Sequence, residues 1–175
     1  RAADVSKPFG GVPIGVKELD QVEGWPDTHA SVPPKDHVPG YTGTMVQRMR
    51  DDGGAVLMGL TTASEFGGVN VTRTKLHGTT HSPWQHGKTP GGSSGGTAAA
   101  VSGGLVTLGT AGDGGGSIRI PAGFTGMVGL KATIGRIPRG PMAQYGNLTV
   151  TIGCISRSVR DTARWFDVTN GFDAR

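Results

Sequence analysis

The sequence predicts an α/β domain, and three observations carry that prediction. The chain has 175 residues, which is enough for one domain with an apolar core. Hydrophobic residue types make up 35% of it and charged types 17%, a composition typical of a globular protein rather than a disordered one. A helical pattern at 44–52 leads directly into an apolar run at 55–60, and a helix followed by an apolar strand is typical of α/β domains.

Three secondary-structure elements are expected in the first half of the chain. Alternating apolar residues after a Gly-Gly turn predict a strand at 9–18, with Lys17 near its end. Residues 44–52 predict a helix that ends at the pair Gly53-Gly54. The apolar face of that helix consists of Met45, Val46 and Met49. The run at 55–60 is then expected to be a buried strand.

The second half of the chain predicts two helices and one strand. A run of alanines indicates a helix at 94–102, and residues 105–110 predict a second buried strand. Ser158 and Asp161 match a capping box, so a helix is expected to begin there and to end near Gly171. The apolar residues that recur at helical spacing in it are Val159, Ala163 and Phe166.

Glycine is over-represented, with 32 residues. Many of these glycines fall in three clusters, at 91–96, 103–104 and 112–116. Glycine is needed where the backbone adopts a positive φ or approaches another group closely. Because apolar segments lie directly between the clusters, we expect short ordered loops there rather than flexible linkers.

The charge and cysteine content argue against several classes of protein. The net charge is +4, but lysines and arginines are scattered singly and no basic run is interleaved with aromatic residues, so no nucleic-acid partner is expected. No apolar stretch approaches the ~20 residues of a membrane span. Cys154 is the only cysteine, which excludes an internal disulfide framework and suits a cytoplasmic location. Since the sequence begins at Arg1 and ends just after a helical pattern, we expect both ends to be truncated.

One motif suggests an α/β-hydrolase. Residues 91–95 satisfy Gly-x-Ser-x-Gly, the nucleophile elbow of that class, with Ser93 at its centre. The catalytic histidine of that class follows the serine in the chain, whereas every histidine here precedes Ser93. An α/β-hydrolase triad would therefore need residues beyond Arg175.

Two other motifs are weaker. Residues 87–89 look like the end of a phosphate-binding loop, but Ser82 stands where the first glycine is required, so we reject that loop. His77 and His81 have the spacing of zinc ligands, yet Gly78 and Pro83 would interrupt the helix that aligns them. Two polar loop histidines are the favoured interpretation, and no metal or cofactor is expected.

The remaining chemistry lies in two Ser-Gly segments and one upstream lysine. These are 91–96 (GGSSGG), 112–119 (GDGGGSIR) and Lys17. Each is a weak signal alone, but together and in this order they resemble the amidase-signature family, with the two serines 24 positions apart as in that family. Further segments that match the family are 11–17, 53–56, 89–92, 120–124, 129–131 and 156–161. The chain departs from the family at Ala111-Gly112, where many members have Gly-Thr, and at Leu60, where many have lysine.

The resemblance implies a serine amidohydrolase with a Ser-Ser-Lys triad. Lys17 would be the base, Ser93 the proton relay and Ser117 the nucleophile that forms an acyl-enzyme. A lysine can accept a proton only when it is neutral, and burial without a carboxylate partner lowers its pKa in that direction. The resemblance also implies a cis peptide bond before Ser93.

The glycines before Ser117 suggest an oxyanion hole. Without side chains, the N–H groups of Gly114, Gly115 and Gly116, with that of Ser117, can converge on one oxygen beside a helix N-terminus. Three further residues match polar family positions around the triad and are expected to hold its loops in place. These residues are Ser94, Asp113 and Arg119.

By resemblance, residues 1–175 are the catalytic core of an amidase-signature fold, in which a central mixed, twisted sheet is flanked by helices on both faces. The expected activity is hydrolysis of a linear carboxylic amide, with a small-molecule amide and a second copy of the full-length chain as partners. One rival is the A subunit of glutamyl-tRNA(Gln) amidotransferase, although those proteins usually have glutamine where this chain has Ile120. The other rival is a non-catalytic relic of such an enzyme.

Overall fold

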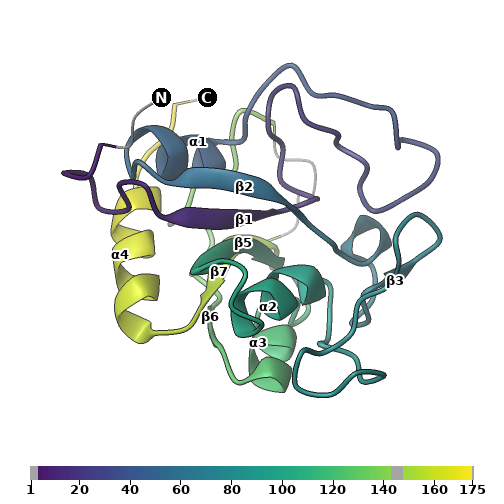
Figure 1. Cartoon of the computed structure of the whole chain (residues 1–175). Coiled ribbons are helices and arrows are strands. Elements are labelled where there is room, and N and C mark those ends of the chain that lie inside the picture. The colour runs from purple at the N-terminus through teal and green to yellow at the C-terminus, as the bar shows by residue number, and fades with distance from the viewer. Residues whose placement is uncertain (1–3, 143–147, 175) are drawn as a thin grey trace.

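A five-stranded mixed sheet forms the centre of the computed structural model, which describes residues 4–142 and 148–174 (Figure 1). The strands run in the order β2-β1-β5-β7-β6. The two pairs that involve β1 are parallel, whereas β7 is antiparallel to both of its neighbours. The strands are β1 (Pro13–Lys17), β2 (Val56–Thr61), β5 (Leu108–Asp113), β6 (Val128–Leu130) and β7 (Thr151–Ser156).

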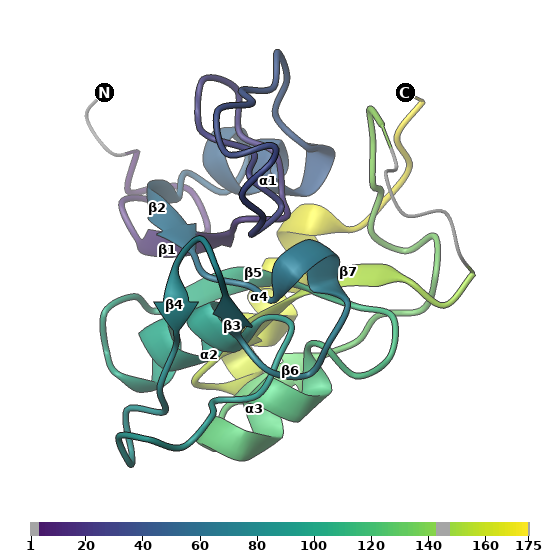
Figure 2. The ribbon, with the colours of Figure 1, turned by 90° about the vertical axis from the view of Figure 1, so that its right-hand side faces the viewer.

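Helices cover both faces of this sheet, as the sequence predicts. An apolar core lies on each side of the sheet. The larger core lies between the sheet and the helices α1 and α4, and the smaller core lies between the sheet and the helices α2 and α3. A small hairpin of β3 and β4 projects beside α2 (Figure 2). The remaining elements are α1 (Thr44–Asp51), α2 (Gly95–Ser102), α3 (Arg119–Thr125), α4 (Val159–Thr169), the 3-10 turn Glu65–Gly67, β3 (Arg73–Thr74) and β4 (Gly78–Thr79).

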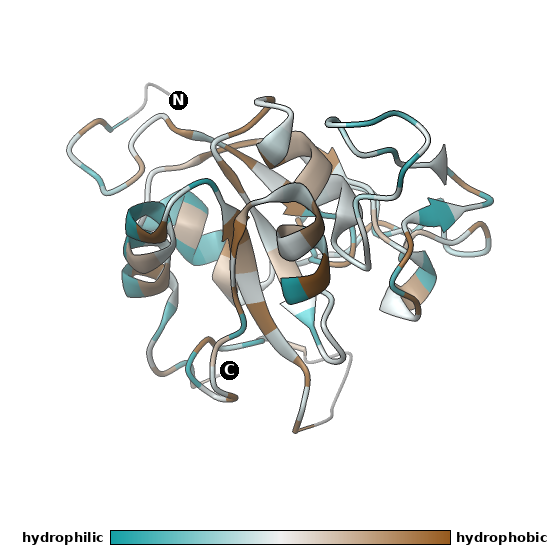
Figure 3. Cartoon of the chain, turned by 90° about the horizontal axis from the view of Figure 1, so that it is seen from below, coloured by the Kyte–Doolittle hydropathy of each residue, from teal (hydrophilic) through white to brown (hydrophobic). Residues whose placement is uncertain are grey.

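Alternation along β1 sends its side chains to opposite faces. Ile14 and Val16 are fully buried in the larger core. Lys17 points to the other face, where α2 begins. Hydrophobic residues gather in the sheet and on the helix sides that face it, while polar residues gather on the outer sides and in the loops (Figure 3). The strand pattern therefore delivers a lysine into the interior at the carboxyl end of β1.

Helix α2 begins with two glycines that lie against neighbouring segments of the chain. A Cβ atom on Gly96 would clash with the backbone of Thr62, and one on Gly95 would clash with the side chain of Thr72. The Gly96 N–H donates to the Thr62 carbonyl at 2.9 Å. The glycines in this cluster thus serve close approach, as the sequence suggests.

Several predicted elements are confirmed with shifted bounds or different burial. The strand predicted at 105–110 begins only at Leu108, and Leu105 is 77% exposed. The apolar run at 55–60 predicts a buried strand, but β2 lies at the edge of the sheet and exposes Met58 by 60%. No described strand pairs with the outer side of β2, so the strand is confirmed but the expectation that it is buried is wrong.

Helix α4 has the predicted capping box and a different buried face. The Ser158 Oγ accepts the Asp161 N–H at 3.1 Å and donates to the Asp161 carboxylate at 2.7 Å. Gly171, with φ of 107°, follows the C-cap Asn170 by one position. The predicted apolar face is wrong at Val159, which is 72% exposed, and at Ala163, which is also exposed, whereas Phe166 is partly buried against the larger core. The buried face consists of Thr162, Trp165 and Thr169.

Sequence patterns do not predict six of the described elements, namely α3, β3, β4, β6, β7 and the 3-10 turn Glu65–Gly67. Helix α3 contains Pro121 and Gly123, two residues with poor helix propensity. Pro121 lies in the first turn of the helix, where its missing N–H would have no intrahelical partner. Among the described residues, no helix is both long and apolar enough to cross a bilayer.

Candidate active site

Lys17 is the buried cation at the centre of the site. It lies at the end of β1 with 2% of its surface exposed. Its Nζ donates to the Ser93 Oγ at 2.7 Å and to the Ser94 Oγ at 2.9 Å. Within the described part of the chain, Lys17 forms no ion pair with a carboxylate. Its environment is therefore built from hydroxyl groups.

Burial lowers the pKa of Lys17 from its usual 10.5 to about 8. The negative charges of Asp20, Asp113 and Glu18 act in the opposite direction without cancelling the effect of burial. A lysine in this state gives up its proton far more readily than an exposed one, so it can act as a base near neutral pH.

Ser93 and Ser94 occupy the loop that leads into α2. The peptide bond between Gly92 and Ser93 is cis, as the family resemblance implies. Gly91 has φ of 89°, and a Cβ atom there would lie 2.9 Å from the Pro121 Cα, so the loop packs tightly against α3. Both serine hydroxyls thereby reach Lys17, and Ser94 contacts the base directly rather than only supporting its loop.

Asp113 organises the loop that carries Ser117. Its carboxylate is buried at the end of β5 and accepts the N–H groups of Gly116 at 2.7 Å and Ile118 at 3.1 Å. The Arg119 guanidinium donates to both carboxylate oxygens, from Nε at 3.0 Å and from Nη2 at 2.9 Å. Burial acts to raise the pKa of Asp113, but these hydrogen bonds outweigh it and hold the pKa at about 2. A permanently ionised aspartate thus ties the turn around Ser117 together.

The same contact changes the composition of the expected oxyanion hole. Because the Gly116 N–H is donated to Asp113, it points away from a shared oxygen. The N–H groups of Gly114, Gly115 and Ser117 have no acceptor among the described residues. Any oxyanion hole in this conformation therefore rests on those three groups.

Ser117 lies beside the other two members of the predicted triad. The Ser94 N–H donates to the Ser117 carbonyl at 3.2 Å, which joins the two serine loops. Between the hydroxyls of Ser93 and Ser117 there is no hydrogen bond, so the second step of the relay stays a prediction. Catalytic hydrogen bonds are often long before substrate binds.

A single cavity of about 480 Å³ joins these groups, a size suited to a small molecule. Lys17, Ser93 and Ser117 line it, as do Gly114 and Gly115. Apolar side chains form much of the remaining wall. These include Leu19, Met45, Val46, Phe66, Val150 and Ile152.

The sequence analysis did not predict a chain of hydrogen bonds that holds the backbone of Lys17 in place. The Lys17 N–H donates to the Thr110 Oγ1 at 2.8 Å, and that hydroxyl donates to the Asp20 carboxylate at 2.5 Å. Asp20 also lines the cavity, and burial raises its pKa. Only the position of Asp20, three residues after Lys17, was a signal in the sequence.

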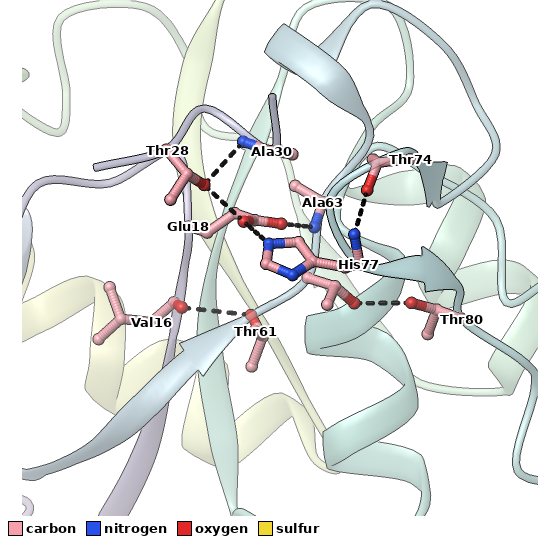
Figure 4. A network of polar contacts seen from close by, with 10 residues as sticks. Val16, Glu18, Thr28, Ala30, Thr61, Ala63, Thr74, His77 and Thr80 are labelled. Atoms are coloured by element: carbon pink, nitrogen blue, oxygen red, sulfur yellow. Dashed lines mark hydrogen bonds and ion pairs between the residues drawn. The ribbon is translucent and has the colours of Figure 1, made fainter. Parts of the chain in front are cut away.

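A second network of hydrogen bonds surrounds Glu18, the residue that follows Lys17 (Figure 4). The buried Glu18 accepts the Ala63 N–H at 2.6 Å and the Thr28 hydroxyl at 2.9 Å, and it contacts the His77 Nε2 at 2.7 Å. His77 therefore belongs to a structural network around β1. His81 instead packs against His86, with ring centroids 4.1 Å apart, so the two histidines that have the spacing of zinc ligands make separate contacts.

Comparison with known proteins gives a consistent result. The family model described as Amidase matches residues 1–175. The A subunit of glutamyl-tRNA(Gln) amidotransferase from Methanococcoides burtonii is 39% identical over 98% of this chain, and that from Oleidesulfovibrio alaskensis is 42% identical over 98%. The chain spans only 36% and 35% of the length of these two relatives.

Solved structures share the same fold. A 6-aminohexanoate cyclic dimer hydrolase superposes with a TM-score of 0.91 at 36% identity, over 96% of this chain and 36% of that protein. The corresponding amidotransferase chain from Thermotoga maritima gives 0.88 at 34% identity, over 93% and 36%. The peptide amidase of Stenotrophomonas maltophilia gives 0.90 at 29% identity, over 96% and 35%.

Proposed function

Because this chain belongs to the amidase family, we propose that it is the catalytic core of an enzyme that hydrolyses linear carboxylic amides to an acid and an amine or ammonia. The substrate is a small-molecule amide, and the reaction takes place in the cytoplasm. In this proposal a second copy of the full-length chain is the assembly partner.

The proposed mechanism uses a serine relay. Lys17 accepts a proton from Ser93, Ser93 accepts one from Ser117, and the Ser117 oxygen attacks the amide carbonyl. When the tetrahedral intermediate collapses, the same chain returns a proton to the departing amine. Water then attacks the acyl group on Ser117 and releases the acid.

The observation that carries this proposal is the hydrogen bond from the Lys17 Nζ to the Ser93 Oγ, at 2.7 Å in a cavity that Ser117 also lines. A buried lysine without an ion pair is unfavourable for stability and useful for proton transfer. Its pKa of about 8 leaves a usable neutral fraction at neutral pH. The N–H groups of Gly114, Gly115 and Ser117, which have no acceptor in the described part of the chain, would stabilise the oxyanion.

A second candidate is the A subunit of a glutamyl-tRNA(Gln) amidotransferase. The relatives named above favour it, since they carry that name at 39% and 42% identity. Ile120 argues for a free amidase, because the amidotransferase chain is expected to have glutamine at this position, and the isoleucine packs against Gly116 and Gly91. Expression of the full-length protein with an affinity tag distinguishes the two, since a member of such a complex would co-purify with stoichiometric partner chains.

The direct test of the proposed chemistry is labelling of the full-length protein with a serine-directed fluorophosphonate, followed by peptide mass spectrometry. We expect the adduct on Ser117 alone. Asp36→Asn is a matched control, because Asp36 is exposed and contacts only Lys35 in the described structure. A protein that is folded but unlabelled would be the non-catalytic relic.

A further inference from the structure

Arg139 is a charged group in the cavity that the proposed chemistry does not use. It lies in the segment after β6, between Pro138 and Gly140, and its half-buried side chain lines the same cavity as Ser117. A guanidinium remains protonated in proteins and carries five N–H donors in a planar fork. A partly buried cation needs groups that accept its hydrogen bonds or balance its charge.

Among the described residues, few groups interact with this guanidinium. The Nη1 of Arg139 donates to the Val150 carbonyl at 3.3 Å, which is its one hydrogen bond to a described residue. None of the described carboxylates forms an ion pair with it. Burial lowers the pKa of Arg139, and the negative charge of Asp20 acts in the opposite direction.

Asp20 is the carboxylate whose charge acts on the pKa of Arg139, but it is engaged elsewhere. Its Oδ2 accepts the Thr110 hydroxyl, which in turn holds the Lys17 backbone. Burial raises the pKa of Asp20, so its negative charge is itself disfavoured. Arg119 offers the contrast, because its guanidinium is held against both oxygens of Asp113.

We propose that Arg139 binds a carboxylate of the substrate, so that the enzyme acts on amides that carry a carboxylate group at a distance from the scissile bond. Monoamides of short dicarboxylic acids are the simplest members of this class. The planar fork of Arg139 would form two parallel hydrogen bonds to that carboxylate, in a cavity of suitable volume. This inference rests on the proposed function for the identity of the reacting group.

The test measures binding separately from turnover. Full-length protein with Ser117→Ala is titrated calorimetrically with the monoamides of succinic, glutaric and adipic acid. The neutral amides of equal length, in which a methyl group replaces the carboxylate, serve as matched probes. We expect at least one monoamide to bind more tightly than its neutral counterpart.

Arg139→Met, added to that variant, should weaken the binding of the monoamide by roughly ten- to a hundredfold and leave the neutral amide unchanged. Arg139→Lys keeps the positive charge, so it should weaken the binding of the monoamide less than Arg139→Met does. Arg136→Met is the matched control, because Arg136 is exposed in the same segment and does not line the cavity. Unchanged binding of the neutral amide also shows that the variant is folded.

Three results would overturn the inference: monoamides that bind no better than neutral amides, equal weakening of both by Arg139→Met, or no effect of that substitution. Turnover by the protein with Ser117 intact is scored separately. Arginine-dependent binding without any turnover would refute the proposed function and support the carboxylate site. Turnover of neutral amides and monoamides at equal kcat/KM, unaffected by Arg139→Met, would support the proposed function and refute the carboxylate site.

Discussion

The depressed pKa of Lys17 predicts the pH dependence of acylation. Burial brings this pKa to about 8, compared with 10.5 for an ordinary lysine. At pH 7 the neutral fraction is then about 10%, about 300-fold more than in an unshifted lysine, since each pKa unit is a factor of ten. If neutral Lys17 is the base, the rate of Ser117 labelling should rise about tenfold per pH unit below pH 8 and level off above it.

The assay is the second-order rate of fluorophosphonate labelling of the full-length protein between pH 5.5 and 10.5. Asp20→Asn should move the midpoint to lower pH, because Asp20 is the carboxylate that most raises the pKa of Lys17. The new amide oxygen can still accept the Thr110 hydroxyl, and Asp36→Asn should leave the midpoint unchanged. A midpoint near 10.5, or one near the value of about 6.5 typical of histidine, would refute the role of Lys17.

Three predictions concern the supporting structure. Asp113→Asn removes the ionised acceptor of three backbone N–H groups and of the Arg119 guanidinium, so the free energy of unfolding should fall by about 1–3 kcal/mol in denaturant titration; an unchanged midpoint would contradict this. Ser158→Ala should cost about 1 kcal/mol in the same assay, whereas Arg157→Ala next to it should cost much less. Because burial raises the pKa of Cys154 to about 12, iodoacetamide should modify it only after unfolding, and rapid alkylation of native protein would show that the thiol is accessible.

The two serine loops could be located from the sequence because their glycine-rich strings, each a weak signal alone, occur together in the order that the family resemblance requires. Around Ser93 the glycines allow α2 to approach the sheet, and around Ser117 they allow the turn that Asp113 holds. Both demands act on the backbone within a few residues. The combination of such segments can therefore be identified without knowledge of the tertiary structure.

Other features depend on contacts between distant parts of the chain. The bond from Lys17 to Thr110 exists because β1 and β5 pair in parallel with Gly15 opposite Gly109, a register that local periodicity does not specify. Arg139 likewise reaches the cavity only through the path of the chain after β6. Neither Thr110 nor Arg139 lies in a motif that the sequence alone would single out.

Two errors in the predicted elements have local causes. The strand expected from Leu105 starts later because the Leu105 N–H still bonds to the Ala100 carbonyl at the end of α2. In α4 the buried face includes Thr162, which contacts the Ser156 hydroxyl at 2.7 Å, and Thr169, which donates to the Trp165 carbonyl at 2.9 Å. Hydropathy patterns miss threonines that are buried with their hydroxyls satisfied.

The identity of the nucleophile is tested most directly by intact-mass detection of the acyl-enzyme, with burst kinetics on an activated aryl ester or amide. The full-length protein should accumulate one acyl group, and Ser117→Ala should accumulate none. Ser93→Ala and Lys17→Ala should each slow acylation by about a hundredfold to ten-thousandfold, and their double variant should lose little more, because a relay acts as one unit. An acyl adduct on Ser93 or Ser94 in the Ser117→Ala protein would contradict the assignment and return attention to the Gly-x-Ser-x-Gly motif.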